Sequence, residues 1–87
     1  MYELIFSRLA VKQISKIKQS KLDEKVNYLL SVIEKNPFQS PPSFEKLNWD
    51  LKGAYSRRIN LKHRLVYTVD DEKKIIHIIS MWTHYEK

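Results

Sequence analysis

The sequence predicts an α+β domain of the order β-α-α-β-β-β, in which a two-helix hairpin packs on an antiparallel sheet. Three features lead to this expectation. Apolar and polar residues alternate near the N-terminus, as in a strand, and two stretches with apolar residues at helical spacing follow. A proline-rich connection then leads to three segments that are rich in β-branched and aromatic residues. With 87 residues and no internal repeat, the chain is expected to form a single domain over residues 1–87.

The first strand and the first helix are predicted from residues 2–17. Strand-like alternation places Tyr2, Leu4 and Phe6 on one side of the chain. Ser7 follows, and a helix is expected to begin there because its side-chain oxygen can accept a hydrogen bond from the first helical turn. The apolar stripe of this helix is expected to consist of Ala10, Ile14 and Ile17.

The second helix is the clearest of the predicted elements. The run from Ser20 to Asp23 resembles a capping box, with Asp in place of the usual Glu, and is expected to open the helix. Asn36 and Pro37 are expected to end it, because proline does not continue a helix. The predicted apolar face consists of Leu22, Val26, Leu29, Leu30 and Ile33.

Residues 37–54 form a long connection that contains all three prolines and the one glycine of the chain. Long connections in small domains often carry functional residues. The segments that follow predict an antiparallel meander, because turns as short as Leu61-Lys62 and residues 70–73 join strands of opposite direction. The three strands are expected at residues 55–60, 63–69 and 74–82.

Alternation along these strands predicts which side chains share a face of the sheet. Arg58 is expected on the face opposite to Arg57, and with Arg64 it could form a basic patch on the face that the helices leave open. The end of the last strand would complete this patch. One continuous face of that strand is expected to carry Ile76, Ile78, Ser80, Trp82 and His84. Tyr85 belongs to the opposite face of the strand. His84 and Tyr85 can therefore serve one site only if the chain leaves strand geometry near Thr83.

The composition points to a polyanionic partner. Lys and Arg number 16 against 10 Asp and Glu, which gives a net charge of +6 and a pI near 9.6. Such an excess in a short chain favours nucleic acid or an acidic protein as the partner, although a merely basic domain also fits. No apolar segment resembles a signal peptide or a membrane span, so a cytoplasmic protein without a membrane partner is expected.

Residue types also exclude or disfavour several kinds of site. The chain has no cysteine, which excludes disulfides, thiolate zinc sites and cysteine nucleophiles. The three histidines lack metal-ligand spacing with acidic partners, so neither a metal nor another cofactor is expected. Two of them, His63 and His77, are interpreted as structural.

Cleavage of RNA without a metal is a reaction that the remaining residues could support. It requires a base for the ribose 2′-hydroxyl, an acid for the departing 5′ oxygen and a cation for the phosphate. Glu45, His84 and Arg64 supply one candidate for each function, and Tyr85 could stack on a base or bind the phosphate. By residue type alone this indication is weak, because many basic proteins contain such residues.

The order of these residues is more specific than their types. The motifs FEKL (44–47), LKGAYSRRI (51–59), HRLVY (63–67) and a C-terminal HY (84–85) resemble the YoeB/Txe family of toxins, within the RelE-like fold group. The resemblance implies a toxin of a bacterial toxin–antitoxin pair, a ribosome-dependent endoribonuclease that cuts mRNA in the A site. It implies 2′,3′-cyclic phosphate and 5′-hydroxyl ends and a YefM-type antitoxin as the partner. Contacts with ribosomal RNA and a homodimer are further expectations.

The resemblance also implies roles for individual residues. Glu45 falls on the general base of the family, Arg64 on its phosphate-stabilising arginine and His84 on its general acid. Tyr85 falls on the C-terminal tyrosine of the family. Arg58 falls on a further substrate-binding arginine.

The chain departs from the family pattern in two places. Asn48 stands where family members commonly have a lysine, and Lys46 and Lys52 are candidate substitutes. Many members end at His-Tyr, whereas this chain continues with Glu86-Lys87. The RNA-binding candidates are Arg57, Arg58, Lys46 and Lys52. Of the two adjacent arginines, Arg58 is preferred for the site, and the other is expected to form a salt bridge or to extend its charged group to solvent.

Two other functions fit the basic charge equally well. One is a nucleic-acid-binding module or repressor without catalysis, and the other is an RNase that does not depend on the ribosome. The joint presence of Glu45, Arg64 and His84 favours an enzyme over the binding module.

Overall fold

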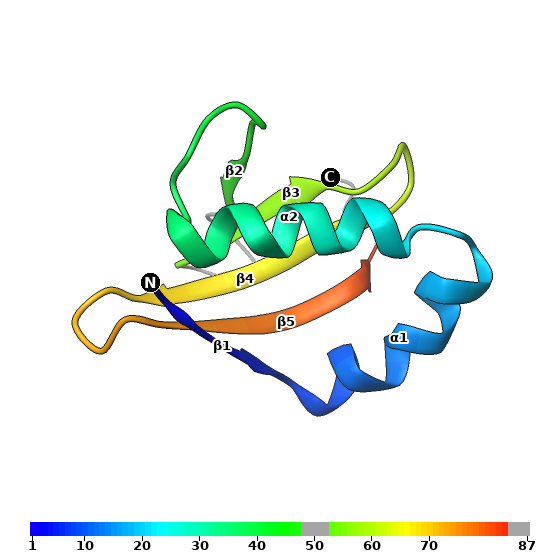
Figure 1. The fold of residues 1–87 in the computed structure, drawn as a ribbon, viewed down its shortest axis with the longest axis horizontal. Helices are drawn as coiled ribbons and strands as arrows, with labels where there is room; N and C mark the ends of the chain where they lie inside the picture. The colour runs from blue at the N-terminus through cyan, green and yellow to red at the C-terminus, as the bar shows by residue number, and fades with distance from the viewer. Residues whose placement is uncertain (48–52, 84–87) are drawn as a thin grey trace.

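The computed structural model describes residues 1–47 and 53–83. Its elements are, in chain order, β1 (Glu3–Phe6), α1 (Arg8–Gln19), α2 (Asp23–Lys35), β2 (Glu45–Leu47), β3 (Ala54–Arg58), β4 (Arg64–Asp70) and β5 (Ile75–Thr83). The strands form one sheet in the order β1-β5-β4-β3-β2. Figure 1 shows α2 lying across this sheet and α1 beside the ends of β1 and β5. The predicted α+β class, with two helices packed on a sheet, is confirmed.

The sheet is mixed, which corrects the prediction of an antiparallel one. β1 runs parallel to β5, and Leu4 is paired with Ile76. The other neighbouring strands are antiparallel to each other. The helices carry the chain away from β1, so this strand can join the edge of the meander in the same direction as β5. Alternation along a strand does not reveal the direction of its neighbour, and the parallel pairing therefore leaves no local signal in the sequence.

Strand β2 lies within the segment that was predicted to be an irregular connection. It pairs with β3, and Glu45 is opposite Ser56. Three residues are too few to show an alternating pattern, so this strand is defined by its neighbour rather than by its own sequence. The observed order of the described residues is therefore β-α-α-β-β-β-β, and Glu45 belongs to an edge strand instead of a loop.

Helix α1 begins where the sequence predicts. The Ser7 hydroxyl oxygen accepts a hydrogen bond from the Ala10 N–H at 3.0 Å, and the same hydroxyl donates to a carbonyl oxygen of β5 at 2.7 Å. Ala10 and Ile17 are buried as predicted, but Ile14 is exposed and Gln13 is buried instead. Gln13 hydrogen-bonds the backbone of β5, a requirement that helical periodicity does not reveal.

Helix α2 begins without the predicted capping box. Ser20 instead caps the C-terminal end of α1, where its N–H donates to the Lys16 carbonyl oxygen at 3.0 Å. The connection between the two helices is so short that Ser20 directly follows the last residue of α1. The N-cap residue of α2 is Leu22, whose side chain makes no capping hydrogen bond. The predicted end of the helix at Asn36 is confirmed.

The main core lies between the helices and one face of the sheet. The predicted apolar face of α2 contributes Val26, Leu29 and Ile33, with Leu22 and Leu30 packed against them. The strands contribute Leu65, Tyr67, Ile76, Ile78 and Met81. A smaller apolar cluster on the opposite face contains Leu47, Ala54 and Val66, with Ile79 beside them. Neither of the described helices is long and apolar enough to cross a membrane.

Strand β5 is irregular, which corrects the prediction of one continuous face. Three steps along β4, from Tyr67 to Arg64, correspond to five steps along β5. Ser80 consequently lies opposite Val66, on the face away from the helices, whereas Met81 belongs to the main core. Extra residues of this kind form β-bulges, which bend a strand and change the direction of its side chains.

The turn between β3 and β4 spans residues 59–63, so it is longer than the predicted turn at Leu61-Lys62. The side-chain oxygen of Asn60 accepts hydrogen bonds from the N–H groups of Lys62 at 2.8 Å and His63 at 2.7 Å. An asparagine side chain that bonds the following backbone in this way stabilises a turn locally.

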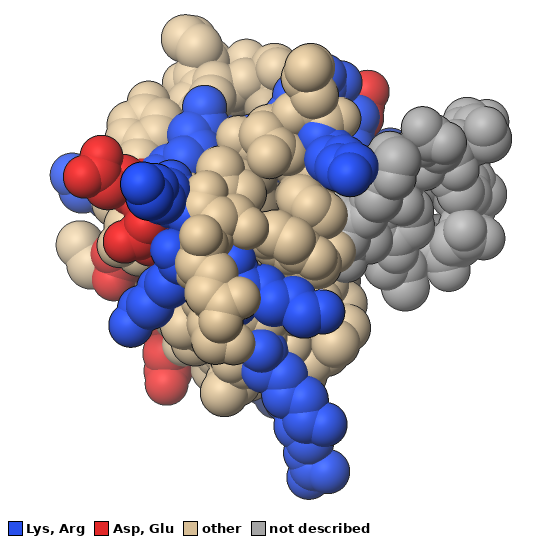
Figure 2. All heavy atoms as spheres, turned by 90° about the vertical axis from the view of Figure 1, so that its right-hand side faces the viewer, with Lys and Arg blue, Asp and Glu red and all other residues tan. Residues whose placement is uncertain are grey.

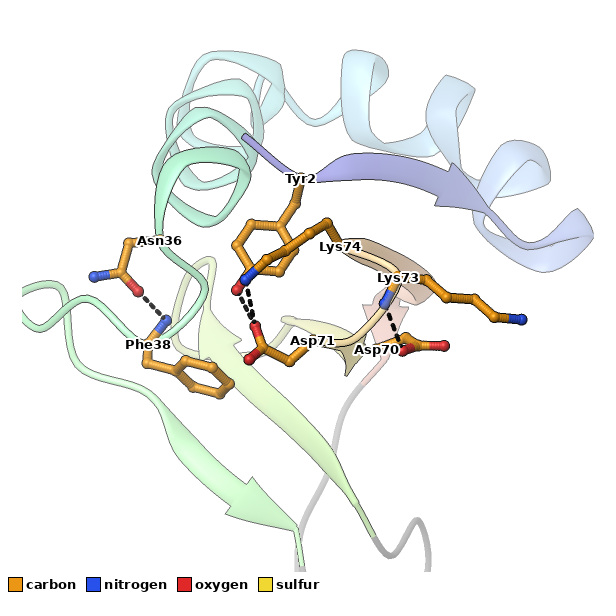
Figure 3. Close-up of polar contacts among 7 residues, drawn as sticks. All are labelled: Tyr2, Asn36, Phe38, Asp70, Asp71, Lys73 and Lys74. Carbon is orange, nitrogen blue, oxygen red and sulfur yellow. Dashed lines mark hydrogen bonds and ion pairs between the residues drawn. The ribbon is translucent and has the colours of Figure 1, made fainter.

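The N-terminus is tied to the turn between β4 and β5. The Tyr2 hydroxyl donates a hydrogen bond to the Asp71 carboxylate, and Lys74 Nζ lies 3.2 Å from the same oxygen (Figure 3). The Lys74 ammonium group also lies 5.1 Å from the centroid of the Tyr2 ring. The Tyr2 hydroxyl first, and Lys74 second, lower the pKa of Asp71. These exposed contacts join the start of β1 to the turn that precedes β5.

Candidate functional site

Strand pairing brings four polar side chains to the sheet face opposite to the main core. Glu45 of β2 is opposite Ser56 of β3, and Arg58 of β3 is opposite Arg64 of β4. Directly paired residues point to the same face, and residues two apart along a strand share it as well. Together with Ser43 and Phe44, these four residues line a small pocket, which we call the β-face pocket.

Arg64 is at the centre of the β-face pocket. Its Nη1 atom donates to the Glu45 carboxylate oxygen Oε1 at 2.7 Å and to the Ser56 hydroxyl oxygen at 3.2 Å. The Arg64 side chain is 18% exposed, whereas that of Glu45 is 66% exposed. An ion pair so open to water contributes roughly 0–1 kcal/mol to stability. The pair therefore adds little to the fold and leaves a carboxylate accessible to a ligand.

The β-face pocket carries a net positive charge. Arg58 is exposed and directly paired with Arg64, and among the described residues that line the pocket Glu45 is the one carboxylate. Like charges at paired positions of a sheet repel each other. A phosphate would offset this repulsion, and planar guanidinium groups match its oxygens. The arrangement can therefore bind a phosphate and present a proton acceptor beside it.

Ser56 is a site residue that the sequence patterns did not identify. It is fully buried, and its hydroxyl oxygen accepts the second hydrogen bond of Arg64. Strand alternation offered a signal, because Ser56 lies two residues before Arg58 on the same face. A buried hydroxyl on that face requires a polar partner, which Arg64 supplies.

Arg57 was predicted to bind RNA, and this prediction is wrong. The residue has 0% exposure and lies on the opposite face of β3 from Arg58. Its guanidinium makes four hydrogen bonds inside the protein, one to the Tyr67 hydroxyl and three to carbonyl oxygens of residues 37–42. Alternation separated the two arginines correctly, but it did not reveal which of the two faces was covered.

Lys46 is exposed but does not line the β-face pocket. It is paired with Tyr55, and strand alternation therefore directs it away from the face of Glu45. Lys46 is one of the candidate substitutes for the lysine that family members commonly have near the base, but on β2 it lies on the face opposite to Glu45.

Several predicted site residues lie outside the residues that the structure describes. They are Lys52, His84 and Tyr85. The residues that depart from the family pattern, Asn48, Glu86 and Lys87, lie outside the described residues as well. The predicted bend after the last strand concerns the same segment. Strand β5 continues to Thr83, which is paired with Arg64, so the described chain ends beside the β-face pocket.

The two described histidines do not line this pocket. The His63 ring stacks on Trp82 with 3.8 Å between the ring centroids, and His77 is exposed on β5. Within residues 1–47 and 53–83, no three His, Cys, Asp or Glu side chains gather in a way that could hold a metal ion.

A second basic surface lies at the turn between α1 and α2. Figure 2 shows Lys and Arg side chains spread across this side of the molecule, with Asp and Glu side chains near its edges. The exposed lysines in and around the turn are Lys16, Lys18, Lys21 and Lys25. Clustered positive charge of this kind is typical of surfaces that contact nucleic acid.

Comparison with known proteins finds the same family by two routes, a family model and a curated relative. A family model described as the YoeB-like toxin of bacterial type II toxin–antitoxin systems matches residues 12–85. Toxin YoeB from Synechocystis sp. is 42% identical over 67 residues, which are 77% of this chain and 76% of the relative.

Solved structures of similar toxins have the same fold. A YoeB–YefM complex from Staphylococcus aureus is 41% identical, with a TM-score of 0.80 over 98% of this chain and 99% of that one. A YoeB dimer from the same organism has a TM-score of 0.81 and 41% identity over 97% of this chain and 98% of that one. A YoeB/ParE toxin from Agrobacterium tumefaciens reaches a TM-score of 0.85 at 27% identity, over 95% and 99% of the chains.

Proposed function

The chain belongs to the YoeB-like toxins of bacterial type II toxin–antitoxin systems, and from this premise we propose that it is a ribosome-dependent endoribonuclease. It cuts mRNA in the ribosomal A site by general acid–base catalysis without a metal. One observation supports this proposal most strongly. Glu45 and Arg64, from different strands, pair at 2.7 Å beside Arg58 in a pocket on the sheet face away from the main core. A proton acceptor beside two guanidinium groups suits the attack of a ribose hydroxyl on the neighbouring phosphate.

In the proposed reaction Glu45 takes the proton of the ribose 2′-hydroxyl, whose oxygen bonds to phosphorus. Arg64 and Arg58 stabilise the negative charge that develops on the phosphate oxygens. The bond from phosphorus to the 5′ oxygen breaks, and His84 donates a proton to that oxygen. Tyr85 binds the phosphate or stacks on a base. The products are a 2′,3′-cyclic phosphate and a 5′-hydroxyl.

The hydrogen-bond geometry of Arg64 suits both of its proposed tasks. Its bonds to Glu45 and Ser56 use the Nη1 atom. A guanidinium group has five N–H donors in a planar fork, and no hydrogen bond to another described residue uses those on Nη2 and Nε, so we propose that these bind a phosphate. Arg64 can thus hold the Glu45 carboxylate through Nη1 and bind the substrate phosphate through its other nitrogen atoms.

The proposed partners follow from the family and from the charge. The YoeB of Staphylococcus aureus forms a complex with YefM, and we expect this chain to be neutralised by an antitoxin of that kind in the cytoplasm. The same relative also forms a dimer, which supports a homodimer here. The lysines at the turn between α1 and α2 are suited to contacts with ribosomal RNA.

The proposal is tested by cleavage of mRNA on purified ribosomes, with 3′ ends analysed for the cyclic phosphate. Glu45→Gln and Arg64→Met should each slow cleavage by roughly 10²–10⁴-fold, since each removes a group that acts in the transition state. Glu24→Gln and Lys35→Met are matched controls on the exposed surface of α2, and they make the same changes of charge. Circular dichroism should show that all four variants are folded.

Each alternative function predicts a different result in this assay. Binding to ribosomes or RNA without cleavage by the natural chain would favour a non-catalytic module. Equally fast cleavage of naked RNA would favour a ribosome-independent RNase. Full cleavage by folded Glu45→Gln and Arg64→Met would refute the catalytic assignment of the β-face pocket.

A further inference from the structure

We propose that Arg57 is a positioning residue, which holds the segment before β2 and thereby sets the place of the Glu45 carboxylate beside Arg64. This inference deepens the proposed function and rests on it, because Glu45 is the base of that reaction. Arg57 lies on the other face of the sheet and acts through the chain rather than on RNA.

The Arg57 guanidinium gathers one segment of the chain around itself. Its Nε atom donates to the Tyr67 hydroxyl at 3.0 Å, and Nη1 donates to the Pro42 carbonyl oxygen at 2.6 Å. Its Nη2 atom donates to the carbonyl oxygens of Pro37 at 3.0 Å and Gln39 at 2.9 Å. The Tyr67 hydroxyl also donates to the Pro37 carbonyl oxygen at 2.8 Å. One buried side chain thus ties three carbonyl oxygens of an irregular segment to β3 and β4.

A second contact of Arg57 reaches the residue next to Glu45. The Arg57 Cζ atom lies 4.9 Å from the centroid of the Phe44 ring, within the range of a cation–π interaction. The Phe44 ring also packs against Tyr55, with 5.9 Å between the centroids. Arg57 therefore contacts both the start and the end of the segment that leads into β2.

Strand β2 needs such support because a short strand at the edge of the sheet is held by few hydrogen bonds of its own. It contains three residues and stands at the edge of the sheet, where β3 is its one neighbour among the described strands. The Glu45 side chain is mostly exposed, and its described hydrogen bond is the one to Arg64. The position of the carboxylate therefore depends on where the preceding segment brings the chain.

Stability alone does not explain an arginine at this position. The ion pairs formed by residues 1–47 and 53–83 do not include Arg57, so its buried charge is balanced by dipoles. Burying a charge costs several kcal/mol, and apolar replacements of similar volume are often neutral or stabilising. An apolar side chain, however, cannot donate hydrogen bonds to three carbonyl oxygens and to the Tyr67 hydroxyl. The feature that requires arginine is the defined path of residues 37–44.

The test compares Arg57→Met with the natural chain in single-turnover cleavage on ribosomes. We expect the rate constant to fall by roughly 10–100-fold, because displacement of a catalytic group by about 1 Å has effects of this size. The affinity for ribosomes should change by less than about two-fold, since Arg57 has no exposed surface. Arg57→Lys retains the charge but lacks the planar fork, so its rate should lie between the two. Ile17→Val, a mild change in the main core, controls for lowered stability.

Two further measurements separate positioning from a general structural role. In a Glu45→Gln background, Arg57→Met should add less than about a two-fold loss, because the group it positions is already removed. Amide hydrogen exchange of β2 should accelerate in Arg57→Met while exchange in α2 stays unchanged. If Arg57→Met does not fold, Tyr67→Phe removes one partner of Arg57 and should give a smaller effect of the same kind.

The outcomes distinguish this inference from the proposed function. If the natural chain does not cleave RNA, the proposed function fails, and the exchange of β2 still decides whether Arg57 holds that strand. Unchanged rate and unchanged β2 exchange in Arg57→Met would overturn the inference. A full additional loss in the Glu45→Gln background would also overturn it, since Arg57 would then act independently of Glu45.

Discussion

Substitution of Gln13 tests how helix α1 holds the irregular end of β5. The Gln13 side-chain oxygen accepts hydrogen bonds from the backbone N–H groups of Met81 at 2.6 Å and Trp82 at 3.2 Å. These two residues lie where the bulges of β5 interrupt its pairing with β4. One glutamine thus replaces a strand partner for two adjacent donors. Gln13→Met removes the acceptor and keeps a side chain of similar length.

The size of the effect follows from the two donors. A buried donor without an acceptor costs about 1–3 kcal/mol. The Met81 N–H is buried and loses its short bond, while the Trp82 N–H is partly buried and loses a longer one. We expect Gln13→Met to lower the free energy of unfolding by about 2–4 kcal/mol. A domain of this length has roughly 4–13 kcal/mol in total, so the loss is a large share of its stability.

Urea denaturation followed by circular dichroism measures this loss directly. The midpoint should fall without a change in the m-value, which reports the surface exposed on unfolding. Gln19→Met at the exposed end of α1 is the matched control and should change the midpoint little. A loss below about 0.5 kcal/mol for Gln13→Met, with an unchanged m-value, would show that the bulge does not depend on this side chain.

Three other results are expected. The lowered pKa of Asp71, caused first by Tyr2 and then by Lys74, contributes stability above about pH 4 that is lost as the pH falls through the folded-state pKa. Asp71→Asn should therefore flatten the acid side of a plot of urea midpoint against pH. The pKa of Tyr67 is raised by burial and partly lowered again by Arg57, so stability is lost as the pH rises above about 10. Tyr67→Phe should reduce this alkaline loss, measured by the same method. Ribosome binding should weaken steeply with salt, and a flat response in a filter-binding titration would argue against phosphate contacts.

The local elements of the fold were predictable because their signals lie in neighbouring residues. The Ser7 cap, the apolar face of α2 and its end at Asn36 depend on contacts within a few positions of the chain. The cap predicted at Ser20 failed for a related reason. The C-cap of α1 and the N-cap of α2 lie within three residues there, and a serine is compatible with either position.

The β-face pocket was predictable only in part. Strand alternation placed Arg58 apart from Arg57, and the family resemblance implied that Glu45 and Arg64 act as the base and the phosphate-stabilising arginine of one site. Neither source revealed Ser56, because its importance lies in a hydrogen bond to another strand. The roles of His84 and Tyr85 stay predictions, since these residues lie outside the described part of the chain.

The sequence by itself determined the two helices, the three meander strands and the family to which the chain belongs, because each depends on local periodicity or on a motif. Tertiary structure alone decided the direction of β1, the existence of β2 and the bulges of β5. It also decided that Arg57 faces the core. The physical reason is that these features arise from hydrogen bonds between residues far apart in the chain. Gln13 shows this most clearly, since its acceptor serves donors 68 and 69 positions away.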